Sequence, residues 1–304
     1  MNFIEGYASK LSVKNGEKIN FHISTNLNKY SVRIYRIGSN ENLVWSKDGL
    51  QGKQYSVPEN VTSHGCRWPV KFSLKIPNSW RTGYYSVILI NRDDFGKLVK
   101  GEISFVLKTA YPGQDANILF QRSTNTDNAY NSWGGSTMYT GPSGPTRCAS
   151  FDRPFAGFPD SIKNYFFDID LIYTDDFNLG KITKSINKIF FKNGYSLSPY
   201  AFIIIEKKNY IWHIHDVGYV YSVINIKNKL KIYDGFTLRH STWHNWERKF
   251  IIWTENQGYK IDYAVNSDLE FNPDILTKYK LVLSIGHDEY WSSPMRDNLE
   301  DFIK

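Results

Sequence analysis

The stretch YKLVLSIGHDEYWS, residues 279–292, decides the fold of the second half of this 304-residue chain. Its first six residues form an apolar run bounded by a glycine, which is typical of a buried strand. Residues 293–304 then begin like a helix with a serine cap and a proline in the first turn. This order predicts a unit of an α/β sheet. The connecting loop leaves the carboxyl end of the strand, where open α/β sheets bind ligands.

This loop, residues 285–292, carries four consecutive side chains that can bind a metal or move a proton: His287, Asp288, Glu289 and Tyr290. Packing alone does not account for this row of polar groups, so we favour a functional site over a polar loop. Extended backbone turns Asp288 away from its neighbours. Asp288 therefore either orients a neighbour or caps the following helix, or else takes part in catalysis.

The flanking sequence extends the α/β pattern. Residues 246–257 have apolar side chains at helical spacing, Gly258 ends that helix, and residues 259–265 form the next candidate strand. Residues 117–121 form an earlier one. We therefore expect a doubly wound parallel α/β domain over residues 111–304.

Residues 1–110 show a different pattern, with apolar side chains at every second position and turn signals between short runs. No helical stretch interrupts it. This pattern predicts an immunoglobulin-like β-sandwich that serves as support or as a partner contact. The Tyr-Pro-Gly sequence at residues 111–113 marks the domain boundary.

Residues 160–243 predict a β-rich insertion in the α/β domain, with candidate strands at 202–205, 219–226 and 230–233. The chain stops at Lys304 with few strands of the sheet accounted for. We therefore expect a C-terminal truncation of a longer natural protein.

Composition argues against several functional classes. The formal charge of +7 is scattered, which argues against nucleic-acid binding. No secretory signal and no apolar run of membrane-spanning length is present, so we expect a cytoplasmic protein. Two cysteines form neither a disulfide framework nor a metal clamp. Cys148 lacks a glycine elbow, so we expect it to be a small buried residue.

The second informative stretch is NAYNSWGG, residues 128–135, just beyond strand 117–121. Its two glycines permit unusual backbone geometry, and Tyr130 and Trp133 add bulk to a loop. One interpretation is an aromatic plug on the sheet. The other is that this segment converges with the loop at 285–292, because both leave the carboxyl ends of strands. A phenol and a carboxylate meeting there could hold a cation that prefers oxygen ligands.

Four parts of the sequence resemble the large subunit of N,N-dimethylformamidase and its relatives: residues 5–9 with 21–26, residues 129–135, residues 150–154 and residues 246–304. The similarity covers about residues 1–155 and 245–304 and leaves out the insertion. It implies an α/β domain of the flavodoxin or glutamine-amidotransferase type. It also implies a hydrolase of small amides that assembles with itself or with a small second subunit.

The resemblance further implies a mononuclear ferric ion held by two tyrosines and a glutamate. Glu289 matches the glutamate ligand, His287 its proton-handling partner, and Tyr130 one tyrosine ligand. Tyr139 is the best match for the second tyrosine, and Asp127 replaces it if the register differs. Phenolate and carboxylate are hard donors that suit ferric iron. We expect His287 to act as base and then as acid, with Glu289 beside it.

Two other functions stay open. A glycan- or protein-binding module that keeps the fold without chemistry fits the aromatic richness, with 9 tryptophans and 21 tyrosines. A glutamine-amidotransferase-like hydrolase would need a nucleophile elbow, which the sequence lacks. The pairs His213 with His215 and His240 with His244 have metal-ligand spacing, but strand and surface roles suit them better.

Overall fold

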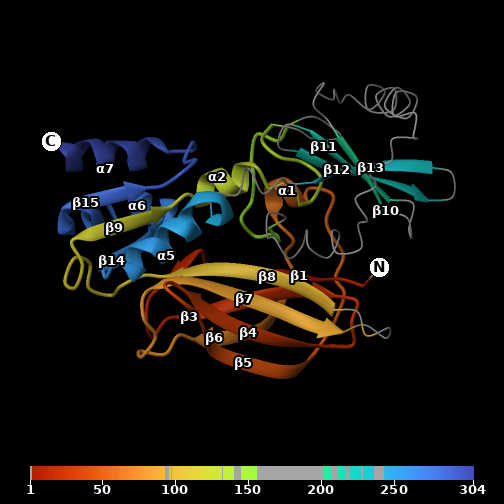
Figure 1. The fold of residues 1–304 in the computed structure, drawn as a ribbon, viewed down its shortest axis with the longest axis horizontal. Coiled ribbons are helices and arrows are strands. Elements are labelled where there is room, and N and C mark those ends of the chain that lie inside the picture. Colours follow the sequence, from red (N-terminus) through yellow and green to blue (C-terminus); the bar gives the residue numbers. More distant parts are fainter. Residues whose placement is uncertain are drawn as a thin grey trace.

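The structure is a computed structural model that describes residues 2–92, 96, 98–131, 133–139, 145–155, 202–206, 211–216, 219–226, 229–235 and 243–304. This part of the chain is mixed α and β, mostly sheets with a few helices (Figure 1). His240 lies outside the described residues, and His213, His215 and His244 are described in their backbone alone.

The N-terminal strands form two sheets. The first is antiparallel and has the order β1 (Ile4–Ala8), β3 (Lys18–Thr25), β6 (Val70–Lys75). The second has the order β2 (Ser12–Val13), β8 (Leu98–Leu107), β7 (Gly83–Arg92), β4 (Lys29–Ile37), β5 (Glu41–Gln51). A short helix, α1 (Val61–His64), also lies in this region, so the expectation of no helix was wrong.

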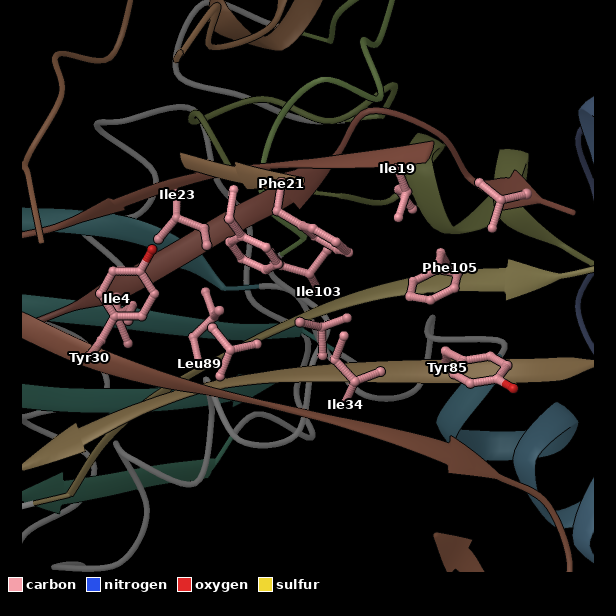
Figure 2. Packing of buried hydrophobic residues seen from close by; sticks show 14 of the residues in the cluster. Ile4, Ile19, Phe21, Ile23, Tyr30, Ile34, Tyr85, Leu89, Ile103 and Phe105 are labelled. Atoms are coloured by element: carbon pink, nitrogen blue, oxygen red, sulfur yellow. The ribbon is translucent and has the colours of Figure 1, made fainter. Parts of the chain in front are cut away.

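Both sheets contribute to one core, which Figure 2 shows from close by. Phe21 of β3 packs edge-on against Phe105 of β8, with ring centroids 6.2 Å apart, and Ile34 of β4 is fully buried. These side chains recur at every second position because successive residues of a strand point to opposite faces. The alternation in the sequence therefore corresponds to two sheets packed on a shared core, which agrees with a β-sandwich.

The C-terminal strands form a parallel sheet in the order β14 (Ile261–Val265), β9 (Ile118–Arg122), β15 (Leu281–Ser284). In the register, Phe120 of β9 lies opposite Tyr263 of β14 on one side and Leu283 of β15 on the other. The carboxyl ends of β9 and β15 are therefore neighbours. The predicted division at residue 110 falls between β8 and β9 and stays a prediction.

Helices lie on both faces of this parallel sheet. On the face toward the sandwich, Ile251 of α5 (Arg248–Asn256) shares a core with Tyr84 and Phe120. On the other face lie α6 (Asn266–Phe271), the 3-10 helix η2 (Pro273–Lys278) and α7 (Ser293–Ile303). The predicted helix 246–257 starts earlier, in the π-helix η1 (Trp243–Glu247). The connector between β14 and β15 contains α6 and η2.

The region of the predicted insertion contains an antiparallel sheet in sequence order: β10 (Phe202–Glu206), β11 (Ile211–Asp216), β12 (Tyr219–Ile226) and β13 (Lys229–Gly235). This agrees with the β-rich character expected there. None of the helices in the described ranges combines the length and the hydrophobicity that a bilayer-spanning segment needs.

A buried ion pair joins the sandwich to the parallel-sheet region. Two guanidinium nitrogens of Arg36 donate to the two carboxylate oxygens of Glu255, at 3.1 and 2.5 Å. The same carboxylate also accepts hydrogen bonds from the Ser39 amide and the Tyr263 hydroxyl. Both ends of the pair are almost fully buried, so it fixes α5 against the end of β4.

Candidate metal centre

Side chains from two distant segments converge on the carboxylate of Glu289. The Tyr130 hydroxyl donates to Glu289 Oε2 at 2.9 Å, and the Tyr139 hydroxyl donates to Oε1 at 2.7 Å. His287 Nε2 lies 2.8 Å from Oε2. The Tyr130 and Tyr139 rings stack with centroids 4.6 Å apart. The four residues that the sequence singled out thus lie within one cluster of contacts.

The sheet topology explains why the two segments meet. Because β9 and β15 are parallel neighbours, the chain leaves both of them at the same edge. After β9 the chain forms α2 (Thr124–Ala129), which ends at Tyr130. After β15 it turns at Gly286, whose φ is +81° and where a Cβ would lie 2.7 Å from the Trp246 side chain. The turn therefore requires glycine both for its conformation and for space.

Thr126 links the two segments directly. Its hydroxyl oxygen accepts the backbone N–H of Glu289 at 2.8 Å and that of Tyr290 at 3.3 Å. Thr126 is fully buried and lies one helical turn before Tyr130, whose own N–H bonds to the Thr126 carbonyl. Through this one residue the backbone that carries Tyr130 is held in register with the backbone that carries Glu289.

The polar chain after β9, which includes Thr126 and Asp127, forms helix α2. Within it, Asp127 is buried and forms an ion pair with Arg122. The hydrogen bond to Glu289 is made by Tyr139. This hydrogen bond is consistent with Tyr139 at the second tyrosine position, and its role as a ligand stays a prediction.

Arg153 holds the backbone of the Tyr130 segment (residues 128–135) through hydrogen bonds. Its guanidinium donates to the backbone oxygens of Asn128, Asn131 and Trp133, with a length of 2.9 Å to Asn131. Arg153 is almost fully buried, and burial lowers its pKa to about 10. A cavity lies on this side of α2, lined among others by Arg153, Asn128 and Asp127, and its described lining includes none of Tyr130, Tyr139 and Glu289.

The pKa shifts at the centre indicate an ionised Glu289 carboxylate that accepts hydrogen bonds from two protonated phenols. Burial raises the pKa of Glu289, but hydrogen bonds from Tyr139 and Tyr130 and the neighbouring His287 outweigh it, so the net shift is downward. Burial and the bond to Glu289 raise the pKa of Tyr130 to about 12, and that of Tyr139 also rises. The protonated phenols and the ionised carboxylate thus stabilise one another.

This donor set fits a hard, highly charged cation. Replacing the two shared protons with a metal would leave two phenolate oxygens and a carboxylate around it, which suits ferric iron. In the described ranges no three His, Cys, Asp or Glu side chains gather as metal ligands do. A cation held here therefore depends on the phenol oxygens.

Of the three roles that we considered for Asp288, its contacts are consistent with orienting its neighbours. Its carboxylate accepts hydrogen bonds from the Ser284 hydroxyl at 2.6 Å and from the Asn266 side chain at 3.5 Å. Burial raises the pKa of Asp288. These contacts hold the turn that presents His287 and Glu289. The helix cap falls instead to Ser292, whose hydroxyl accepts the Met295 N–H.

Two residues at the site were not among the predicted site residues. Tyr290 donates to the Tyr139 hydroxyl at 2.6 Å, and Thr126 bridges the backbones. Tyr290 could have been included, because it belongs to the same polar row. Nothing in the sequence marks Thr126. The expectation for Cys148 was also wrong, because its loop leaves it exposed, whereas Cys66 is buried.

Comparison with known proteins gives one strong match. The family model described as "N,N-dimethylformamidase beta subunit-like, C-terminal" matches residues 31–304, including residues 160–243, which we expected to lie outside the resemblance. The comparison with curated proteins finds no match.

Solved structures give partial likenesses. CopC from Methylosinus trichosporium OB3b is 18% identical, with 36% of this chain and 97% of CopC covered and a TM-score of 0.22. Murine CRIg is 17% identical, with 36% and 99% covered and a TM-score of 0.24. Pectate lyase Pel3 from Pectobacterium carotovorum is 11% identical, with 39% and 32% covered and a TM-score of 0.21. The family match covers most of the chain. The chain therefore belongs to the N,N-dimethylformamidase beta subunit-like, C-terminal family.

Proposed function

We propose that this protein is a metal-dependent hydrolase of small amides that uses a mononuclear ferric ion. The observation that carries the proposal is the convergence of the Tyr130 and Tyr139 hydroxyls on the two carboxylate oxygens of Glu289. Membership of the dimethylformamidase-like family supports the reaction class. The proposed ligands are these three residues, because their oxygens already lie within hydrogen-bond distance of one another.

The protein's own residues would bind the cation and move the protons. When bound, the ferric ion would supply a Lewis acid for the amide carbonyl. His287 Nε2 lies 2.8 Å from Glu289 and its side chain is about one third exposed, at 34%. The imidazole can therefore reach both the ligand cluster and solvent. It would take a proton from the attacking water and return it to the departing amine, which gives an acid and an amine.

Bound iron in purified protein tests the proposal. We expect the wild type to bind ferric iron and to show a visible phenolate charge-transfer band. Glu289→Ala should lose most of the iron, because it removes the carboxylate to which both phenols donate hydrogen bonds. Glu300→Ala is the matched control, since Glu300 is an exposed carboxylate on α7 that pairs with Arg296 one helical turn away. Unchanged iron content in Glu289→Ala would rule out the ligand assignment.

A glycan-binding module is the second candidate, and one observation favours it. Trp253 and Tyr259 are each about half exposed, at 53% and 52%, and their rings lie 6.2 Å apart. Exposed aromatic rings of this kind can stack on sugars. A colourless protein that takes up no iron but binds an oligosaccharide would favour this function over hydrolysis.

The wider architecture and assembly are also proposals. Parallel strands with helices on both faces support a doubly wound domain of the flavodoxin or glutamine-amidotransferase type. The family description names a beta subunit, which supports assembly with copies of this chain or with a small second subunit. A cytoplasmic location belongs to the same proposal.

A further inference from the structure

A third phenol belongs to the candidate centre without contacting the carboxylate. The Tyr290 hydroxyl donates to Tyr139 Oη at 2.6 Å, and Tyr139 donates in turn to Glu289 Oε1 at 2.7 Å. A phenol has one proton to donate. Because Tyr139 directs its proton to Glu289, its oxygen receives the proton of Tyr290. The three side chains form a relay that points toward the carboxylate.

The position of Tyr290 is fixed at both its backbone and its ring. Its N–H bonds to the Thr126 hydroxyl at 3.3 Å, and its carbonyl accepts from the Asn125 side chain at 3.1 Å. Its ring meets the Tyr139 ring edge-on, with centroids 6.2 Å apart and planes at 81°. The contact with Tyr139 is therefore built into the fold rather than made by a free surface side chain.

We propose that Tyr290 is a positioning residue for the Tyr139 ligand, which it orients and whose electron donation to the cation it weakens. The proposal rests on the proposed function. When Tyr139 gives up its proton to bind a cation, its oxygen becomes an anionic acceptor, and the bond from Tyr290 becomes charge-assisted and stronger. Such partners of a ligand fix its orientation and change its basicity.

The consequence is specific to the metal–phenolate bond. A hydrogen bond on the Tyr139 oxygen lowers the energy of the electrons that this oxygen shares with the ferric ion. Removing the bond raises that energy, so less light energy is needed to move an electron from phenolate to iron. The visible band should then move to longer wavelength, an effect that a loss of packing alone would not produce.

The test compares Tyr290→Phe with Tyr279→Phe. Tyr279 is a suitable control, because it is a buried tyrosine of the same region that donates to a carboxylate outside the centre, Asp262, at 2.8 Å. In ferric-loaded Tyr290→Phe, we expect the band at longer wavelength and the affinity for ferric iron about 10- to 100-fold weaker. In Tyr279→Phe both should equal the wild type, even if melting of the metal-free protein shifts.

The outcomes separate this proposal from the proposed function. A coloured Tyr290→Phe protein with unchanged band and affinity would overturn the role of Tyr290 and leave the ferric site intact. A wild-type protein that takes up no ferric iron would overturn both. A longer wavelength in Tyr290→Phe but not in Tyr279→Phe supports the proposal, whatever the two melting temperatures are.

Discussion

Replacing Thr126 with valine should loosen the register between the two halves of the centre. Valine has nearly the shape of threonine but lacks the hydroxyl that accepts the Glu289 and Tyr290 amides. Because Thr126 is fully buried, the substitution leaves packing in place and removes one acceptor. Two backbone N–H groups then lose their partner.

The cost follows from the two hydrogen bonds. An unsatisfied buried donor costs about 1–3 kcal/mol. The Glu289 bond, at 2.8 Å, has near-ideal length, whereas the Tyr290 bond, at 3.3 Å, is weaker. Both residues are partly exposed, so water replaces part of the loss. We therefore expect the substitution to lower the free energy of unfolding of the metal-free protein by about 1–2 kcal/mol. Ferric affinity should fall about 5- to 30-fold if the bound state loses a further ~1–2 kcal/mol beyond the loss in the metal-free protein, because the ligands must then be brought into register on binding.

Urea unfolding and ferric titration measure these two quantities. Thr126→Ser keeps the hydroxyl and should restore ferric affinity. Thr254→Val is the control, because Thr254 is an equally buried helical threonine whose hydroxyl donates to the Phe250 carbonyl, away from the centre. It should reduce stability but leave ferric affinity unchanged. The reasoning fails if Thr126→Val binds iron as tightly as Thr254→Val does.

Two further substitutions test the surrounding fold. Glu255→Gln should cost about 3–5 kcal/mol at neutral pH, because it leaves the Arg36 charge buried. Burial raises the pKa of Glu255, but Arg36 outweighs it and holds the pKa below 4.5. The pair's contribution should therefore be full above that pH and fade in acid, where urea-unfolding curves of variant and wild type should converge. Gly286→Ala should lower both stability and ferric affinity, because the added Cβ would collide with the Trp246 side chain. Gly258 has the same φ but open space around it, so Gly258→Ala should lower stability by about 1 kcal/mol and leave ferric affinity unchanged. Equal ferric affinity in the two glycine variants would contradict this.

The strands with regular patterns could be predicted from the sequence, but some of the helices could not. The apolar runs of β9 and β15 identify a parallel sheet because both of its faces are covered. In contrast, five of the six residues of α2 are Thr, Asn or Asp, which have poor helix propensity. It is stabilised by tertiary contacts, such as the ion pair between Arg122 and Asp127. No local pattern reports such a contact, so the sequence did not predict this helix.

The same distinction applies to the centre. The meeting of Tyr130 with Glu289 could be predicted, because it follows from two loops at one edge of a parallel sheet. Tyr139 came from the resemblance alone, since residues 131–138 give no local sign of where the chain turns back. Thr126 acts through the backbone amides of Glu289 and Tyr290. Its role therefore depends on a contact between segments more than 160 positions apart, as the sequence numbers alone show.

The sandwich also takes part in holding the centre. The Trp133 indole N–H donates to the Glu5 carboxylate of β1 at 2.7 Å, and its ring packs edge-on against Trp68. Thr62 of α1 donates to the Gly134 carbonyl at 3.4 Å. Trp133 lies three residues after Tyr130, so the Tyr130 segment is held between the sandwich on one side and the loop at 285–292 on the other. The hydrogen bond from Tyr130 to Glu289 therefore depends on the folding of both parts of the chain. The N-terminal sheets thus help to position the site, although none of the proposed ligands comes from them.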